Sequence, residues 1–461
     1  MGNYEGYGKA ELGDERLSTR LQRLLEQLAG DPTASISAAC QDPYQAKAAY
    51  RFTANDNVTT AAITKITRDV TISNILAATP PVLLMPQDTT EINFSNLKAA
   101  SGMGNIGTRK TDMGILAHSA IAVSEAGMVY GLMAQKIWVR PTEEHGKSSN
   151  RGKLPIEAKE SYKWLETMEN AGASFPEGTM VVHICDREGD IYEFFCKANG
   201  DGNNYLCRRR HDRKIESGNG SKRLDDLEKA LPVAGRLTVR VPRDSHTNRI
   251  ARDAELEIKY GKCEITKTSN LSGNNDLPES IGVYIVSASE TDAPPGQEKI
   301  YWQLITNVPT ESFEDAVTRI QWYTQRWKIE IFHRTLKSGC KVEELQSDSA
   351  DKLMKLIAIY SIIALQIMEL VYLGRTQPDM PCEICFTEDE WKLLYRVANK
   401  TKQLPGKPPT IQEAVVMIAK MGGFLARKSD GFPGATVIWR GLTKFYTILE
   451  AVPFLLELLA E

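Results

Sequence analysis

The first segment of the chain carries leucines at helical spacing. Residues 15–29 read ERLSTRLQRLLEQLA, with leucine at 17, 21, 24, 25 and 28 and the arginines off that stripe. This spacing is typical of an amphipathic α-helix. The stretches DPYQAKAAYRF and TTAAITKITRDVTISNIL predict further helices, so residues 1–75 are predicted to be all-helical and mildly basic.

Short apolar runs replace the helical pattern after residue 75. PVLLMPQD (81–88) and MVVHICD (180–186) are each predicted to be a buried strand that ends in an acid. GILAHSAIAV and MVYGLMAQKIWV flank SEAG, which predicts a β-hairpin around Gly127. Strands mixed with helices over residues 76–375 indicate an α/β fold.

Residues 215–300 have a β pattern of their own, in RLTVRVPR, DAELEIKYGKCEIT and GVYIVSAS. We interpret them as a β-rich insertion, after which IYWQLITN returns as a strand to the core. Residues 312–339 then predict one helix, which begins with a capping box at Ser312 and Asp315 and ends at Gly339. Residues 376–461 are predicted to be helical.

One apolar stretch, LIAIYSIIALQIMELVYLG (356–374), has the character of a membrane span. Its uncharged part ends at Met368 and is shorter than the roughly 18 residues that a span needs. Ser361 and Gln366 interrupt it further. A buried helix is therefore the better interpretation, and we expect no membrane contact.

Composition limits the function classes. A chain of 461 residues predicts two to four domains, and 42% hydrophobic with 25% charged residues is typical of globular proteins. The net charge of −3 argues against a protein that coats nucleic acid by bulk charge, although local basic clefts remain compatible with it. Eight scattered cysteines and no secretory pattern predict a cytoplasmic protein with reduced thiols.

Two acids, Asp88 and Asp186, follow the apolar runs. If the two strands lie side by side, the carboxylates meet, and such an approach is unfavourable unless a cation lies between them. Hard oxygen ligands suit Mg²⁺ or Mn²⁺. Taken separately, each residue is more often an ordinary loop acid. Glu91, Glu188 and Asp190 are competing candidates for the same role.

The segment YTQRWKIEIFHRTLK (323–337) places one acid among cations. At about 100° per residue, Tyr323, Arg326, Glu330 and Lys337 fall within roughly 60° of one another on a helix. The alternative is a solvated helix with i,i+4 ion pairs. No acid lies between Asp315 and Glu330 to pair with the cations there, so phosphate partners are favoured.

This Tyr-x₂-Arg-x₃-Glu-x₆-Lys pattern resembles the signature of cut-and-paste bacterial DDE transposases of the insertion-sequence-four group. QDTTEINFS and CDREGDIYEF resemble the segments around the first and second catalytic Asp of that family. ELGDERLSTRL and AAYRFTANDNV resemble its N-terminal DNA-binding region. AKESYKWL, IYWQLITNVP, MIAKMGGFLARK and LTKFYTILEA extend the likeness almost end to end.

The resemblance implies an RNase H-like catalytic core at 76–375, interrupted by the β-rich insertion 215–300. It also implies a helical DNA-binding domain at 1–75 and a helical C-terminal domain at 376–461 that is a candidate for dimerisation. The interval from the second acid to the third is 330 − 186 = 144 residues, which leaves room for an extra subdomain. The hydrophobic pattern agrees with this division.

The resemblance further implies metal-dependent cleavage at transposon ends, a DNA hairpin and strand transfer into target DNA. Asp88, Asp186 and Glu330 would be catalytic and would bind two Mg²⁺ ions, for which Mn²⁺ substitutes. The expected partners are double-stranded DNA, from transposon ends and target, and a second copy of the chain in the synaptic complex. The expected location is the bacterial cytoplasm, at the nucleoid.

Two other functions stay open. One is a related nuclease that cuts DNA without transposition, and the other is a non-catalytic DNA-binding or inhibitory relative. The presence of all three acids favours activity. The chain begins a few residues before ELGDERL, whereas family members carry more sequence there. We therefore expect the first helix to be trimmed or replaced, which would weaken recognition of transposon ends but leave the chemistry unchanged.

Several residues are candidates for DNA contact. Arg326 and Lys337 would hold phosphates, Tyr323 would donate to a phosphate oxygen, and Arg334 is favoured by its charge over His333, whose role stays open. Trp327 lies beside this strip and is expected to pack on the core.

Trp302 is by pattern a core aromatic, but the resemblance suggests a pocket for a base flipped from the duplex. LCRRRHDRK gathers cations, among them Arg208, Arg210 and Arg213. Such a cluster is often a solvated loop, but here it follows the second acid's motif, so contact with the DNA backbone is favoured.

Overall fold

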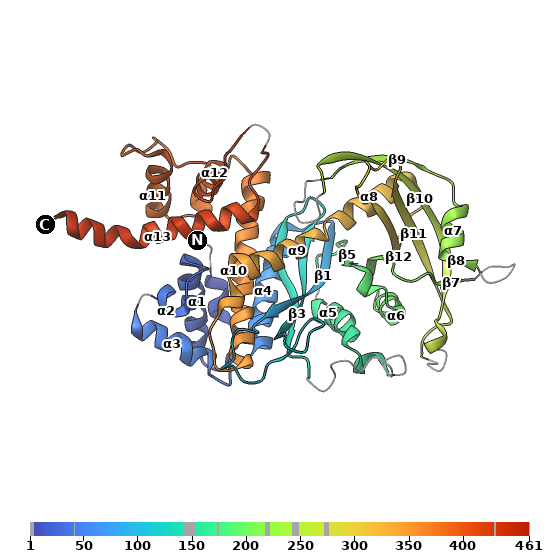
Figure 1. The fold of residues 1–461 in the computed structure, drawn as a ribbon, viewed down its shortest axis with the longest axis horizontal. Helices are drawn as coiled ribbons and strands as arrows, with labels where there is room; N and C mark the ends of the chain where they lie inside the picture. The colour runs from blue at the N-terminus through green and yellow to red at the C-terminus, as the bar shows by residue number, and fades with distance from the viewer. Residues whose placement is uncertain are drawn as a thin grey trace.

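The computed structural model describes residues 4–40, 42–141, 154–172, 175–216, 222–241, 249–271, 276–427 and 430–460. A mixed β-sheet runs through the centre of the molecule (Figure 1). Helices of the N-terminal and C-terminal regions gather at one end of this sheet (Figure 1). The prediction of a mixed α/β fold between helical N- and C-terminal regions is confirmed.

The strand order is β2-β3-β1-β5-β6-β12-β11-β10-β7-β8, with β4 paired to β3 and β9 to β10. Only the pairs β1–β5 and β5–β6 are parallel, and the other described pairs are antiparallel. The strands are β1 Val82–Asn93, β2 Gly104–Asn105, β3 Met113–Ser124, β4 Val129–Trp138, β5 Met180–Cys185, β6 Asn204–Arg208, β7 Lys214–Ile215, β8 Lys222–Arg223, β9 Gly235–Val241, β10 Arg252–Thr266, β11 Ser280–Glu290 and β12 Tyr301–Thr306.

The helices follow the amphipathic stripes that the sequence shows. In α1 the leucine stripe is buried from Leu21 onward and Leu17 is half-buried. Asp14 caps the helix by accepting a hydrogen bond from the backbone N–H of Arg16. The helices are α1 Glu15–Gly30, α2 Ile36–Ala39, α3 Pro43–Thr53, α4 Thr60–Ala78, α5 Lys163–Ala171, α6 Tyr192–Gly200, α7 Leu224–Ala230, α8 Phe313–Thr324, α9 Trp327–Arg334, α10 Ala350–Thr376, α11 Glu388–Asn399, α12 Ile411–Met421 and α13 Ala435–Ala460.

The hairpin predicted around Gly127 joins β3 to β4. Gly127 adopts φ +88°, in the left-handed region that glycine tolerates best. A Cβ at this position would also meet the side chains of Gln325 and Lys328, between 2.8 and 3.1 Å away. The turn therefore lies directly against the junction of α8 and α9.

The two faces of the parallel strands pack into different cores. Leu84 of β1 and Ile184 of β5 belong to the large core that also contains α8, α9 and α10. Cys185 of β5 belongs to a second core with α5 and α6. Because side chains alternate along a strand, residues two positions apart in β1 or β5 lie on the same face of the sheet.

The β-rich segment extends the central sheet. β11 pairs with β12, and β12 pairs with β6, so the hydrogen-bonded ladder continues from the core into the residues 215–300 (Figure 1). Residues 217–221, 242–248 and 272–275 of the predicted insertion lie outside the described residues.

The predicted single helix 312–339 is interrupted. Ser312 and Asp315 form the expected capping box, but α8 ends at Thr324 and α9 begins at Trp327. The backbone N–H groups around the junction bond to carbonyls three residues earlier, which marks a tightened turn. Thr335–Gly339 then form one π-helical turn. The side chains of α9 therefore point in different directions from those expected for one continuous helix over residues 312–339.

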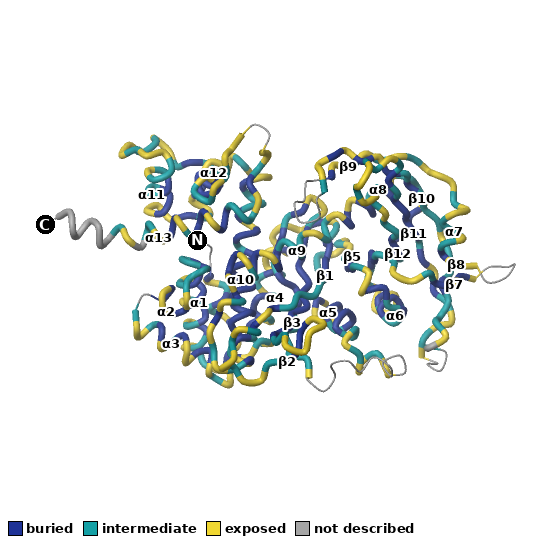
Figure 2. Tube along the Cα trace, in the orientation of Figure 1, coloured by how far each residue is buried: buried dark blue, intermediate teal, exposed yellow. Residues whose placement is uncertain are grey.

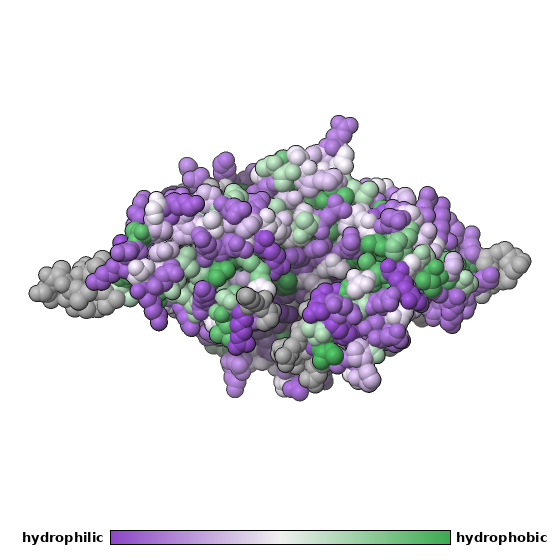
Figure 3. Space-filling model, turned by 90° about the horizontal axis from the view of Figure 1, so that it is seen from above, coloured by the Kyte–Doolittle hydropathy of each residue, from purple (hydrophilic) through white to green (hydrophobic). Residues whose placement is uncertain are grey.

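The apolar stretch 356–374 forms most of α10, a helix long and apolar enough to cross a membrane by length and composition. It lies inside the fold, between the N-terminal helices and the sheet, and is mostly buried (Figures 1 and 2). The prediction of a buried helix is confirmed. Much of the outer face seen from above is hydrophilic, with smaller apolar patches (Figure 3).

A neighbouring pair on α4 tests how this helix packs on the sheet. Ile75 is fully buried, whereas Leu76 is 50% exposed. We expect Ile75→Ala to lower the free energy of unfolding by about 2–5 kcal/mol. Leu76→Ala, the matched control, should change it by only about 0.5 kcal/mol. Urea unfolding measures both, and equal losses would contradict the packing.

Candidate active site

Asp88 lies inside β1, not past its end, which corrects the sequence-based placement. β1 continues to Asn93 because it still pairs with β3, where Asp88 is opposite Ser119. The parallel pairing with β5 ends at Pro86 opposite Ile184, because β5 itself stops at Cys185. Asp88 is therefore paired with β3 on one side, whereas on the other side the pairing with β5 has already ended.

Asp186 comes directly after β5. Two further steps in the register from Pro86–Ile184 bring Asp88 opposite Asp186, on strands spaced about 4.8 Å apart. Both positions share the face of Leu84 and Ile184, which is the face covered by α9. Asp186 also begins a 3₁₀ turn, where its Oδ1 accepts a hydrogen bond of 2.7 Å from the N–H of Glu188.

Glu330 reaches the same place from α9. The Arg326 guanidinium lies 3.6 Å from Oδ2 of Asp88 and also donates a hydrogen bond to Oε1 of Glu330. One cation thus links the first and third acids. This pairing corrects the inference from sequence that Arg326 lacks an acidic partner.

The electrostatics of Asp88 reflect all three acids. Its pKa is raised to about 7, mainly by burial and then by the charge of Asp186, with a smaller contribution from Glu330. The backbone N–H of Thr89, 2.8 Å from Oδ1 of Asp88, and the charge of Arg326 oppose this rise. A partly buried carboxylate beside like charges favours a cation next to it.

The donor set suits a hard divalent cation, but the side chains are not arranged around one. Among the described residues, no group of three acidic, His or Cys side chains is placed to hold a metal ion as it stands. The reason is visible in the ion pairs, since Arg326 takes the position between Asp88 and Glu330. The carboxylate oxygens are therefore suitable ligands for Mg²⁺ or Mn²⁺, but the side chains would have to change conformation to bind one.

The other residues of the helical signature differ in exposure. Tyr323 is buried, with its ring 5.8 Å from that of Trp302 in an edge-on contact, and burial raises its pKa to about 12. Lys337 is half-buried, donates to the carbonyl of Glu91 at 2.8 Å and pairs with Glu343 at 3.2 Å. Their roles toward phosphate stay predictions.

Two residues near the end of α9 also differ in exposure. Arg334 is exposed, in the last turn of the helix. His333 is buried, so it is not a surface residue of this helix.

Trp327 does not pack on the core as expected, because it is 45% exposed. The tightened turn at the junction of α8 and α9 rotates it outward, and the Arg326 guanidinium lies 5.6 Å from its ring centre. An exposed aromatic side chain thus stands three residues before Glu330. A continuous helix, as the sequence suggested, does not predict this position.

The competing acids have other partners. Asp190 is buried and forms an ion pair with Arg213, whose Nε and Nη2 lie 2.9 and 2.5 Å from its Oδ1. Glu91 accepts a hydrogen bond from the N–H of Gly107 at 2.9 Å. Glu188 is exposed beside Lys163. Asp190 is therefore a structural residue. Because Arg213 is buried against it, Arg213 is not exposed for the predicted contact with DNA.

The remaining cations at the end of β6 and just after it differ in exposure. Arg209 is turned inward and bonds to Gln303 and Asp225. Arg208 is half-buried and donates to the carbonyl of Tyr301 at 3.0 Å, whereas Arg210 is exposed. The backbone N–H of Arg210 donates to Oδ2 of Asp190 at 2.7 Å, which fixes the loop close to the second acid's turn.

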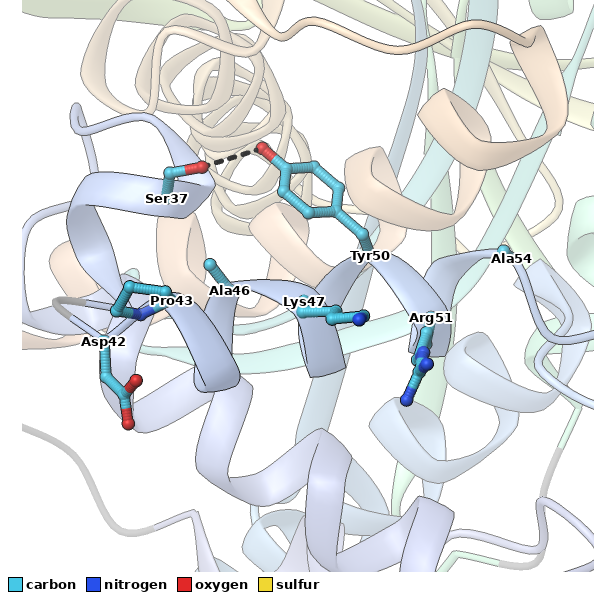
Figure 4. A pocket seen from close by; sticks show the side chains of 8 residues that line it. All are labelled: Ser37, Asp42, Pro43, Ala46, Lys47, Tyr50, Arg51 and Ala54. Atoms are coloured by element: carbon cyan, nitrogen blue, oxygen red, sulfur yellow. Dashed lines mark hydrogen bonds between the residues drawn. The ribbon is translucent and has the colours of Figure 1, made fainter.

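A second candidate surface lies on α3, where an open groove has a volume of about 700 Å³ (Figure 4). Lys47, Tyr50 and Arg51 are exposed on this helix, and the hydroxyls of Tyr50 and Ser37 lie 3.1 Å apart. Tyr44 is 83% exposed nearby. Cations interleaved with aromatic residues suit a nucleic-acid backbone. The helical spacing of positions 47, 50 and 51 was the signal that sequence reasoning missed.

The raised pKa of Asp88 predicts a pH effect on metal-free protein. Between about pH 4 and pH 7 this carboxyl is protonated in the folded state but ionised in the unfolded chain. The folded state binds the extra proton, so stability falls as pH rises through this window. In Asp88→Asn the contribution is absent.

Urea unfolding with a chelator at about pH 5 and pH 8 measures this effect. The wild type should lose stability relative to Asp88→Asn as pH rises. Parallel pH profiles would contradict the assigned shift.

Two comparisons with protein families concern the regions on either side of this site. A family model described as Transposase DNA-binding matches residues 5–58, which include the groove on α3. A family model described as Transposase Tn5 dimerisation domain matches residues 362–455, which begin within α10. The sequence motifs also resemble those of the Tn5 transposase. The two matches support a Tn5-like transposase that binds DNA and forms a homodimer.

Proposed function

We propose that the chain is a DDE DNA transposase of the insertion-sequence-four group. It would cleave transposon ends and transfer the strands to target DNA by a cut-and-paste route. The observation that carries this proposal is the position of Asp88, Asp186 and Glu330. Two neighbouring parallel strands and one helix direct the three acids to one face of the sheet. The matches to transposase DNA-binding and dimerisation domains flank this face in the chain.

The arrangement of strands supports an RNase H-like core, although the sheet here continues into β10 and β11. β1 pairs antiparallel with β3 and parallel with β5, and β5 pairs parallel with β6. A helix that carries the third acid then packs on the same face. Other parts of the proposal, including the hairpin intermediate, rest on the sequence resemblance.

Asp88, Asp186 and Glu330 would hold two Mg²⁺ ions, with Mn²⁺ as a substitute. The ions would activate a water or a 3′-hydroxyl and stabilise the leaving oxygen at phosphorus. The chain's own contribution is to keep three carboxylates on rigid elements. Arg326 pairs with two of them, so its guanidinium would have to move for a metal ion to bind between them.

DNA would approach this face between cations from two elements. Arg326 lies just before α9, Arg334 is its last residue and Lys337 follows it, whereas Arg208 ends β6 and Arg210 lies two residues further on. Charges of this kind position a phosphate backbone without reading its sequence. Trp302 borders Tyr323 and is half-buried, which is compatible with a pocket for a flipped base.

A gel assay with the element's terminal repeats and Mg²⁺ tests the chemistry. Asp186→Ala should abolish end cleavage, because it removes one of the three carboxylates. Glu188→Ala is a matched control two residues away, exposed in the same turn, and should retain cleavage. Trp302→Ala should reduce hairpin products on the same denaturing gel.

Cleavage that survives in Asp186→Ala would refute the assignment. Cleavage by wild type without strand-transfer products would favour the nuclease alternative. DNA binding without any cleavage would favour a non-catalytic relative.

The groove on α3 is proposed as a DNA contact of the N-terminal region. Lys47→Ala and Arg51→Ala should each weaken binding and lower the slope of log affinity against log salt by about 1. Lys229→Ala, an exposed lysine on α7, is the matched control and should leave the slope unchanged. Unchanged slopes in both groove variants would place the contact elsewhere. Titrations by fluorescence anisotropy at several salt concentrations measure these slopes.

A further inference from the structure

A chain of hydrogen bonds lies behind the candidate active site. The hydroxyl of Thr89 is 2.8 Å from Nδ1 of His118, and Nε2 of His118 is 3.4 Å from Oε1 of Gln87. Nε2 of Gln87 is 3.0 Å from Nδ1 of His183. The chain therefore crosses three adjacent strands, from β3 through β1 to β5.

Burial fixes the direction of these bonds. It lowers the pKa of His118 well below its usual value and that of His183 to about 4, so both rings are neutral. A neutral imidazole has one donor and one acceptor. Oε1 of Gln87 can only accept from His118, and Nε2 of Gln87 can only donate to His183. Thr89 therefore donates to the remaining nitrogen of His118. Loss of one member leaves a buried polar atom without its partner, which is costly.

The chain is shielded from water. Gln87, His118 and His183 are buried, and the ring of Trp164 from α5 lies 4.6 Å from that of His118, edge to face. Water therefore has little access to replace a lost bond. Such a largely buried network favours one geometry of the strands that carry it.

Thr89 connects this network to the reactive face. Gln87 and Thr89 flank Asp88 in β1, and their side chains project to the opposite face because side chains alternate along a strand. The backbone N–H of Thr89 donates to Oδ1 of Asp88 at 2.8 Å. His183 lies in β5, three residues before Asp186. The network thus holds both strands from which the first two acids project.

We infer that Thr89, His118, Gln87 and His183 are positioning residues that set the carboxylate of Asp88 for a divalent cation. The side chains of Gln87 and Thr89 lie on the opposite face of β1 from Asp88, so the network would act through the strands and not by direct contact with a ligand. The inference rests on the proposed role of Asp88 in metal binding and adds the side chains that orient it. Hydrogen-bond partners behind a metal ligand typically change metal affinity about 10- to 100-fold when they are removed.

Thr89→Val tests the inference, because valine keeps the branched shape and the backbone N–H but lacks the hydroxyl. We expect its affinity for Mn²⁺, measured on the full chain by electron paramagnetic resonance, to fall about tenfold or more. Thr89→Ser restores the hydroxyl and should bind Mn²⁺ nearly as the wild type does.

Thr71→Val is the matched control. Thr71 is a buried threonine of α4 whose hydroxyl is 3.0 Å from the carbonyl of Leu132. Both valine variants should lower the thermal unfolding midpoint, because each loses a buried hydrogen bond. Only Thr89→Val should lose Mn²⁺ affinity, and an equal loss in Thr71→Val would overturn the inference.

Gln87→Met is a second test if Thr89→Val does not fold, because methionine has a similar length and lacks the amide. Wild-type affinity for Mn²⁺ in either folded variant would overturn the inference while leaving the proposed function intact. Failure of the proposed function has a different result, since the wild type itself would then neither bind Mn²⁺ nor cleave DNA.

Discussion

The repulsion among three carboxylates on one face of the sheet is the constraint on which the site depends. Asp88 and Asp186 are brought together by the register of two parallel strands, and α9 adds Glu330 from above. Such a group is unstable in a partly buried position without a compensating charge. In this structure Arg326 supplies it, and the surrounding fold supplies rigidity. Strands β1 and β5 carry buried side chains on both faces, which holds the parts of the chain that lead to the two aspartates.

Much of this could be predicted from the sequence, because strong periodic patterns have few structural solutions. The leucine stripe of α1, the hairpin at Gly127 and the buried character of α10 follow from spacing and length. The positions of Asp88 and Glu330 near one another were inferred from the motifs. The interruption before Trp327 was not, because the sequence there has no proline or glycine and remains helical in pattern.

Long-range partners were also outside the reach of a single sequence. Asp190 and Arg213 look like a spare metal ligand and a DNA contact, yet they bury one another. For the same reason, the sequence did not predict that the sheet continues into β11. A strand at β12 could return to the core whether or not β11 paired with it. In each case the role of a residue or strand depends on a partner that is distant in the sequence, and the local sequence pattern does not identify that partner.

The internal counterion has a thermodynamic consequence. In the proposed function, a metal ion bound between Asp88 and Glu330 would displace the Arg326 guanidinium, which would then need another anion within reach. A DNA phosphate is such an anion. Ligands that relieve each other's cost bind with positive cooperativity, and the coupling is reciprocal. Free protein would then discriminate against loose metal, and the duplex would recruit the ions together with the arginine.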